Sequence, residues 1–216
     1  MFDRIAPSYD LLNRVMTFRV DVAWRRRLVR DLALEPGERL LDLCAGTMDV
    51  AAEVKRQQPG VAVIGADFSL QMLARGAEKT GLPAAQADAL RLPFPDATFD
   101  AVTVAFGVRN LDSYEAGIAE MARVLRPGGR MGILEFFRAE SSGSRFVHGA
   151  YNKLALPVFG RILSPDPEAY RYLVESMERF ASRPEFEAAA LRRGFAKVSG
   201  ASLFPGVCGL VVASKA

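Results

Sequence analysis

Short apolar runs rich in valine, leucine and isoleucine alternate with stretches in which apolar residues recur at helical spacing. Runs of the first kind are typical of buried strands, and their alternation with helices indicates a parallel sheet covered on both faces. We expect seven strands, at Arg39–Leu43, Val61–Ala66, Ala84–Ala87, Ala101–Ala105, Arg130–Phe136, Lys197–Ser202 and Gly209–Ala213.

Helical spacing predicts the elements between these strands. The expected helices are Asp49–Gln57, Leu70–Lys79, Ser113–Val124 and Arg183–Arg193. The last is the best marked, because Ser182 and Glu185 have the spacing of a capping box and Pro184 suits a first helical turn. Gly194 can then take the left-handed position that ends this helix.

The chain of 216 residues has the length of one domain. We interpret residues 1–216 as a single α/β domain with a helical N-terminal region at 1–35. The alternation of strands and helices stops at residues 140–182, where prolines interrupt a mixed segment, and we interpret this as an insertion. The predicted fold is a Rossmann-like, seven-stranded, mostly parallel sheet with helices on both faces.

Charge and cysteine content exclude several classes of function. The 28 basic and 25 acidic residues give a net charge of +3, which is too small an excess to favour nucleic acid but is compatible with an anionic membrane surface. Cys44 and Cys208 lack metal-ligand spacing, so we predict no metal site, a reducing cytoplasm and two buried thiols. No apolar run approaches the roughly 18 residues of a membrane span.

Residues 42–49, Asp-Leu-Cys-Ala-Gly-Thr-Met-Asp, lie where the first strand turns into a helix. Doubly wound folds bind nucleotides at this place. With Gly46 as its single glycine, the turn lacks the exposed backbone that a pyrophosphate requires. The turn therefore argues against NAD.

S-adenosylmethionine carries a sulfonium, an amino acid moiety and a ribose diol but no phosphate, so its site should offer carboxylates and loop backbone. Asp42 and Asp49 supply carboxylates beside the turn. Asp67 ends the second strand about 20 residues later, where a carboxylate binds a ribose diol. Phe68 and Met72 would then flank the adenine.

Asp88 follows the third strand, where its carboxylate can accept a hydrogen bond from the amine of adenine. A single aspartate at a strand end is more often a helix N-cap. Three acids at successive strand ends, Asp42, Asp67 and Asp88, together favour the cofactor site.

Two short segments are distinctive. Residues 106–110 read Phe-Gly-Val-Arg-Asn, and residues 170–173 read Tyr-Arg-Tyr-Leu. The blocks Leu-Pro-Phe-Pro-Asp at 92–96 and Arg-Pro-Gly-Gly at 126–129 occur more widely in methyltransferases. Together these segments resemble the ubiquinone/menaquinone biosynthesis C-methyltransferases, of the demethylmenaquinone methyltransferase type, over essentially the whole chain.

The resemblance implies a class I methyltransferase fold with an inserted helical lid at 140–182. It also implies S-adenosyl-L-methionine as the cofactor, with S-adenosyl-L-homocysteine as its product, and adds Thr47, Ala89 and Ala105 to the contacts. The full set of expected cofactor residues is Asp42, Gly46, Thr47, Asp67, Phe68, Met72, Asp88, Ala89 and Ala105. Met48 stands where relatives usually have glycine, and Ala105 where many have serine.

The activity implied by the resemblance is C-methylation of a demethylated isoprenoid quinol, either demethylmenaquinol or the benzoquinol of the ubiquinone pathway. A quinone ring is electron-poor, so the acceptor must be the quinol, whose phenolic oxygen activates the neighbouring carbon when it loses its proton. Arg109 can donate hydrogen bonds to that oxyanion, and Asn110 can orient a hydroxyl or water. Tyr9 or Asp10 can relay the proton. The alternative for Arg109 is a salt bridge to Asp112 or to the strand-end acids.

His148 is the single histidine but lies outside every motif, so we expect it at the surface or in the lid. Apolar residues with interspersed arginines and lysines make the insertion suitable for a lid over a prenyl tail or for membrane contact, and equally for packing on the sheet or on a second subunit. The expected partner is a membrane-dissolved prenylated quinol. We expect a cytoplasmic enzyme that contacts the inner face of the membrane, and leave a homodimer open.

Two other functions fit the same residues. The chain could methylate another small hydrophobic acceptor. It could also be a non-catalytic, cofactor-binding member of a quinone-biosynthesis complex, with Met48 and Ala105 as signs of lost activity.

Overall fold

The computed structural model describes residues 20–139, 175–204, 206 and 208–216. The predictions for Tyr9, Asp10 and His148, and most of those for the lid and the N-terminal region, lie outside the described residues. Of the predicted lid, residues 175–182 are described.

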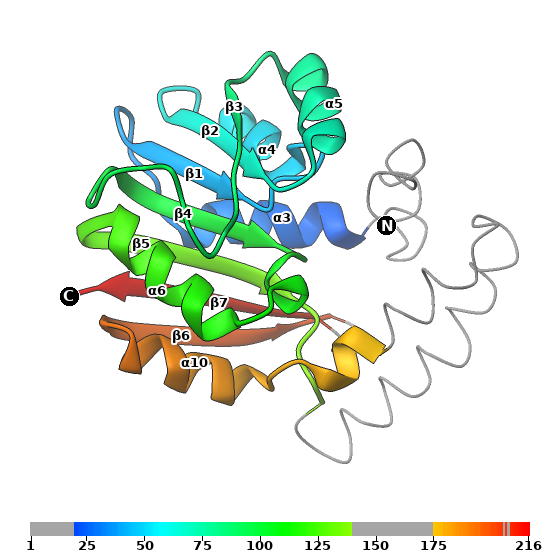
Figure 1. The fold of residues 1–216 in the computed structure, drawn as a ribbon, viewed down its shortest axis with the longest axis vertical. Helices are drawn as coiled ribbons and strands as arrows, with labels where there is room; N and C mark the ends of the chain where they lie inside the picture. The colour runs from blue at the N-terminus through cyan, green and yellow to red at the C-terminus, as the bar shows by residue number, and fades with distance from the viewer. Residues whose placement is uncertain (1–19, 140–174, 205, 207) are drawn as a thin grey trace, which may run out of the picture.

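A seven-stranded sheet forms the centre of the molecule (Figure 1). Its strands follow the order β3-β2-β1-β4-β5-β7-β6, and β7 is antiparallel to both of its neighbours while the other pairs are parallel. The predicted fold class is confirmed. The strands are β1 Arg39–Leu43, β2 Ala62–Asp67, β3 Ala84–Gln86, β4 Phe99–Ala105, β5 Leu125–Glu135, β6 Phe195–Leu203 and β7 Cys208–Lys215.

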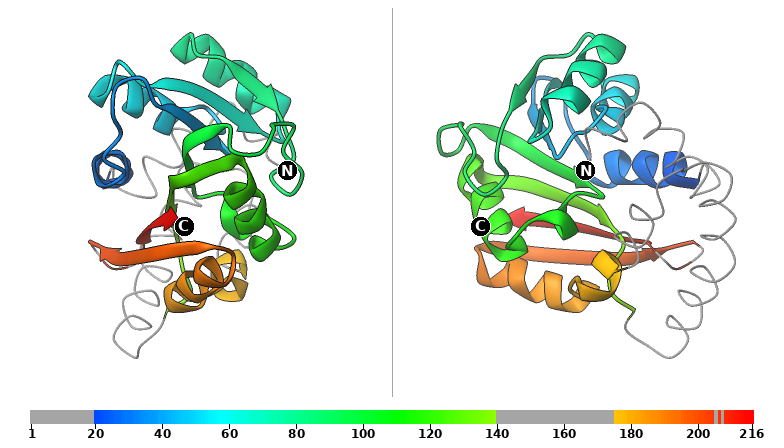
Figure 2. Two further views of the ribbon diagram at one scale, coloured as in Figure 1. Left: turned by 90° about the vertical axis from the view of Figure 1, so that its left-hand side faces the viewer. Right: turned by 45° about the vertical axis from the view of Figure 1, so that its right-hand side comes forward.

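Helices cover both faces of this sheet (Figure 2). The described helices are α3 Val20–Asp31, α4 Asp49–Gln57, α5 Leu70–Thr80, α6 Tyr114–Val124 and α10 Arg183–Arg192, with a short 3-10 helix, η1, at Val108–Asn110. Apolar side chains of α3 and α4 form one core with the sheet, and those of α6 and α10 form the core on the opposite face. The predicted strand-helix alternation thus produces three layers.

Local signals set the helix ends as the sequence predicts. Ser182 and Glu185 form the predicted capping box of α10, and Gly194, with φ +95°, follows its end. Ser113, expected as the first residue of α6, is instead its N-cap and accepts a hydrogen bond from the amide of Ala116.

Four strands, β4 to β7, begin earlier than their apolar runs predict, and β5 does so by the largest margin. Phe99 of β4 pairs with Leu125 of β5, whereas Ala101 pairs with Arg130, so a bulge separates the two parts of the ladder. The Arg-Pro-Gly-Gly block fills this bulge, and Gly128 has φ +73° there. The polar block is therefore part of β5, which the hydrophobic pattern alone does not indicate.

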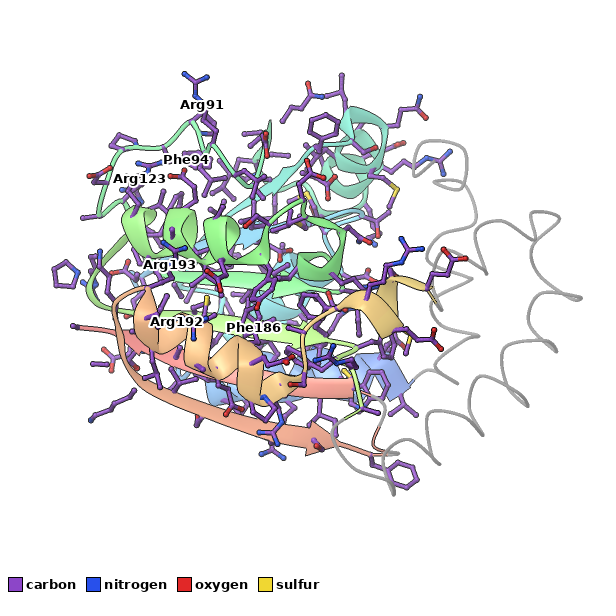
Figure 3. All side chains as sticks on the ribbon, turned by 60° about the horizontal axis from the view of Figure 1, so that its bottom comes forward. Arg91, Phe94, Arg123, Phe186, Arg192 and Arg193 are labelled. Atoms are coloured by element: carbon purple, nitrogen blue, oxygen red, sulfur yellow. The ribbon has the colours of Figure 1, made fainter. Side chains whose placement is uncertain are left out.

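Two contacts fix helices to the rest of the molecule. Trp24 of α3 donates a hydrogen bond from Nε1 to the carbonyl of Phe204, just after β6, at 2.9 Å. On the opposite face, Arg192 at the end of α10 and the next residue, Arg193, bind Glu115 of α6, and the buried Phe186 packs from the first turns of α10 (Figure 3). Both helical layers are therefore anchored to elements far away in the sequence.

Candidate functional site

The candidate site lies where the strand order reverses. The chain proceeds from β1 to β2 on one side and from β4 to β5 on the other, so the turns after the adjacent strands β1 and β4 diverge. Ligands of open α/β sheets bind in the crevice that such a divergence creates. A cavity of about 740 Å³ occupies this place, within the range of small-molecule sites.

Most of the predicted cofactor residues line this cavity. Those that do so are Gly46, Asp67, Phe68, Met72, Asp88, Ala89 and Ala105. They come from the segments that follow β1, β2, β3 and β4, so residues far apart in the sequence meet at the carboxyl ends of parallel strands.

Asp67, the last residue of β2, is held by two backbone donors. Its Oδ2 accepts from the amide of Gly46 at 2.8 Å, and its Oδ1 accepts from the amide of Ser69 at 2.8 Å. A carboxylate oxygen can accept more than one hydrogen bond, so these two contacts are compatible with the binding of a diol. Its contact with Gly46 also joins the turn after β1 to the end of β2.

The other predicted cofactor residues of the cavity differ in exposure. Met72 and Ala89 are buried, whereas the side chain of Phe68 is 76% exposed. Asp88 is exposed and accepts a hydrogen bond from the amide of Leu90 at 2.8 Å, so it both lines the cavity and caps a local turn. The two interpretations of Asp88, ligand and cap, are therefore compatible.

Asp42 and Thr47 are buried and do not line the cavity. The Asp42 carboxylate accepts hydrogen bonds from the amide of Ala51 in α4 and from the hydroxyl of Thr103 in β4, both at 3.0 Å. Burial raises the pKa of Asp42 to about 7, although both hydrogen bonds and the charge of Arg25 act in the opposite direction. Asp42 thus stabilises the turn after β1 through these hydrogen bonds, without lining the cavity.

Met48 adopts a backbone conformation that favours glycine, with φ +61° and ψ 35°. Its side chain is fully buried between β2 and α5. A methyl group on Gly65 would lie 2.7 Å from its Cε, and one on Gly76 would lie 2.6 Å from its Cγ. The side chain of Met48 therefore fills the space beside Gly65 and Gly76. The turn keeps the left-handed backbone that a glycine would favour.

Arg109 lines a second cavity of about 290 Å³, which shares Leu111 and Asp112 with the first. Its side chain, 9% exposed, donates from Nη1 to the carbonyl of Phe106 at 2.6 Å and to Glu135 Oε1 at 2.7 Å. Arg109 therefore forms a salt bridge, with Glu135 and not with Asp112. Its Nε is buried and has no hydrogen-bond partner among the described residues.

Asn110, the last residue of η1, lines the first cavity, and its side-chain amide donates to the Phe106 carbonyl at 3.4 Å. The short η1 helix thus directs Arg109 and Asn110 toward adjoining cavities.

Three residues of the site have roles that sequence reasoning missed. The sequence motifs assign Glu135 no role, although an acid that ends an apolar strand is a usable signal. Cys44 was expected to be fully buried, but it is half-buried and lines the cavity, while Cys208 is buried as expected. Gly107 also lines the cavity, directly beside Cys44.

Burial raises the pKa of both thiols, with nearby carboxylates adding to the effect. The Cys44 thiol is consequently a neutral, weakly nucleophilic part of the cavity wall.

No helix within the described part of the chain is long and apolar enough to cross a membrane.

Comparison with known proteins connects this geometry to a family. A model of the ubiE/COQ5 methyltransferase family matches residues 1–215. A demethylmenaquinone methyltransferase of Thermus thermophilus is 48% identical over 201 residues, which are 90% of this chain and 91% of that protein. A ubiquinone/menaquinone biosynthesis C-methyltransferase UbiE of Geobacter sulfurreducens is 45% identical over 203 residues, covering 90% of this chain and 79% of the relative.

Solved structures share the fold at low sequence identity. A possible histamine N-methyltransferase of Thermotoga maritima superimposes with a TM-score of 0.71 at 20% identity, covering 100% of this chain and 98% of its own. The phosphoethanolamine N-methyltransferase 2 of Haemonchus contortus, in complex with S-adenosyl-L-methionine, gives a TM-score of 0.69 at 15% identity and covers 89% of this chain and 52% of its own. The sheet and its layers are thus those of methyltransferases.

Proposed function

The chain belongs to the ubiE/COQ5 methyltransferase family, and we propose that it transfers a methyl group from S-adenosylmethionine to a ring carbon of a demethylated isoprenoid quinol. The observation that carries the proposal is the pair of adjoining cavities. One lies at the strand reversal and is lined by acids, and the other is lined by Arg109, whose side chain is nearly buried.

The first cavity fits the methyl donor. At about 740 Å³ it has the size of a small-molecule site, and it offers a carboxylate at Asp67 for a ribose diol and another at Asp88 for the amine of adenine. Phe68 and Met72 would flank the adenine, and the turn at Gly46 would meet the amino acid moiety. When bound, S-adenosylmethionine supplies an electrophilic sulfonium methyl group.

The second cavity fits the acceptor ring. At about 290 Å³ it is smaller than a typical complete ligand site, and it adjoins the first at Leu111 and Asp112, so a ring placed there lies beside the donor. Arg109 remains protonated and can donate hydrogen bonds to the phenolate oxygen that forms as the quinol loses its proton. Because a guanidinium does not release its own proton, Arg109 stabilises the oxyanion and another group accepts the proton.

The tail of the acceptor supports a further part of the proposal. An isoprenoid quinol is dissolved in the membrane, so we propose that the enzyme contacts the cytoplasmic membrane surface without spanning it. Flotation of the protein with vesicles of mixed neutral and anionic lipids tests this. Recovery of the protein only in the dense fraction would contradict membrane contact without affecting the proposed reaction.

Methyl transfer with labelled S-adenosylmethionine tests the function itself. We expect label in chemically reduced demethylmenaquinone and none with unrelated phenols, and the benzoquinol of the ubiquinone pathway serves as the second acceptor. Transfer to unrelated phenols at a similar rate would favour a general hydrophobic acceptor. Binding of the cofactor without transfer to either quinol would contradict the proposal and favour a non-catalytic role.

A further inference from the structure

We propose that Glu135 is a positioning residue, which holds the guanidinium of Arg109 against the wall of the second cavity in the orientation that the acceptor requires. The inference rests on the proposed function, because it assigns Glu135 a role in that same reaction. Glu135 acts through Arg109 and does not line either cavity.

The contacts of Glu135 hold both ends of Arg109. Glu135 ends β5 and is fully buried. Its Oε1 accepts from Arg109 Nη1 at 2.7 Å, and its Oε2 accepts from the backbone amide of Arg109 at 3.2 Å. Oε1 also accepts from the amide of Phe136 at 2.8 Å, which fixes the carboxylate itself. One rigid carboxylate therefore restrains the start and the tip of the arginine side chain.

Two aromatic residues complete this restraint. The carbonyl of Phe106, a residue with φ +60°, accepts from Arg109 Nη1 at 2.6 Å. The guanidinium carbon lies 5.8 Å from the centre of the Phe136 ring, which stacks on Phe106. Nη1 is thus occupied by protein acceptors, while Nε has none among the described residues. The guanidinium is therefore anchored through Nη1.

Stability alone is a weak reason for this buried pair. Apolar residues of similar volume often serve as well or better, because taking two charges out of water costs more than their attraction returns. The position of the pair gives a better reason. Arg109 lines the cavity that adjoins the methyl donor's site, whereas Glu135 contacts Arg109 and lines neither cavity. The carboxylate of Glu135 therefore holds the long side chain of Arg109 in one orientation.

If Glu135 orients Arg109, and if it only lowers the positive potential of Arg109, opposite effects of Glu135→Gln are expected. The inference is therefore testable. If Glu135 only weakened the positive potential of Arg109, Glu135→Gln would strengthen the stabilisation of the phenolate, raise kcat and move the acidic limb of the pH–rate profile to lower pH. If Glu135 positions Arg109, the amide supplies one acceptor oxygen where two are needed. The guanidinium then loses its orientation, and the acidic limb of the pH–rate profile moves to higher pH.

We expect Glu135→Gln to lower kcat on reduced demethylmenaquinone about tenfold or more, a smaller loss than deletion of a direct oxyanion donor. The acidic limb should move to higher pH, and the dissociation constant of S-adenosylmethionine should stay within about twofold, because the donor cavity is untouched. The matched control is Asp100→Asn, a buried carboxylate at the amino end of β4 that binds the Arg39 amide at 2.6 Å. It should affect stability but not the pH profile.

Chemical rescue provides a second measurement that does not depend on the single Glu135 variant folding. Added guanidinium ion should restore part of the activity of Arg109→Ala, because Glu135 and the Phe106 carbonyl still bind a cation there. It should restore none in the double variant Arg109→Ala/Glu135→Gln, in which both members of the pair are neutral. Equal rescue in both variants, or a Glu135→Gln limb at lower pH, would overturn the inference. An inactive wild-type protein would instead refute the proposed function.

Discussion

Cys44 and Gly107 approach each other so closely across the strand reversal that no side chain fits between them. A methyl group on Gly107 would overlap the Cβ of Cys44 and lie 3.0 Å from its Sγ. Gly107 has φ −114°, which any residue can adopt, so the restriction at this position is steric. The spacing of the turns after β1 and β4 therefore depends on the absence of a side chain at 107.

We expect Gly107→Ala to weaken the binding of S-adenosylmethionine by about tenfold or more, because overpacking displaces one of the two turns at a cost of roughly 1–3 kcal/mol. Isothermal titration calorimetry measures this. Adding Cys44→Gly should restore part of the affinity, since it removes the clashing Cβ. Adding Cys44→Ala, which keeps that carbon, should not, and equal recovery in both would contradict the steric explanation.

Asp67→Asn should weaken the binding of S-adenosylmethionine more than Asp88→Asn. The first change removes charge and one acceptor from a carboxylate that also holds the amides of Gly46 and Ser69, a loss of about 10- to 100-fold for hydrogen bonds of 1.5–3 kcal/mol. The second affects an exposed carboxylate with one described hydrogen bond. Titration of both variants with the cofactor compares them, and similar losses would argue against Asp67 as the principal carboxylate.

Asp42 should make the protein less stable as the pH rises from about 4 toward 7. Burial raises its pKa from 3.8 to about 7, so in this window the folded state retains a proton that the unfolded state has released. The stabilisation is complete below the unfolded pKa and is lost at pH values above about 7, at up to about 1.4 kcal/mol per pH unit.

Asp42→Asn removes this dependence and leaves both hydrogen bonds possible. Its amide oxygen can accept from Ala51, and its NH₂ group can donate to the Thr103 hydroxyl. Urea unfolding at pH 5 and pH 8 should show that the variant gains stability relative to wild type as the pH increases. A wild-type stability that rises between these pH values, with no change in the variant, would contradict this assignment.

Met48→Gly should destabilise the fold even though it relieves a left-handed backbone. Losing a fully buried methionine costs about 2–5 kcal/mol, whereas relief of the left-handed conformation returns about 1–2 kcal/mol, so the middle of the two ranges gives a net loss of about 2 kcal/mol. Thermal unfolding measures it. Gly65→Ala in the same chain should recover part of this loss, because its methyl group enters the space that Met48 fills. A stabilised single variant would show that strain outweighs packing here.

Features that depend on neighbouring residues were predictable from the sequence. The capping box of α10 requires Ser182 and Glu185 three residues apart, and Asp67 and Asp88 follow directly on apolar runs. Because the carboxyl ends of parallel strands share one edge of the sheet, these acids meet without any information on packing.

Features that depend on distant pairing were not predictable. Asp42 is the fourth of the five residues of β1, whereas Asp67 is the last residue of β2. The Asp42 side chain is directed toward Thr103 of β4 and does not line the cavity, and the strand order determines which neighbour it meets. Glu135 and Arg109 meet because η1 folds back over the end of β5. Their separation of 26 residues carries no periodic signal.

The order of the strands also governs how the chain can fold as it is synthesised. β7 is the last of the described strands along the chain, yet it lies inside the sheet, between β5 and β6. Until it emerges, β5 presents an unpaired edge and β6 has no partner in the sheet, which is the state in which nascent strands pair wrongly or aggregate. The strands β1 to β5 pair with one another without β7, whereas β6 joins the sheet only through it.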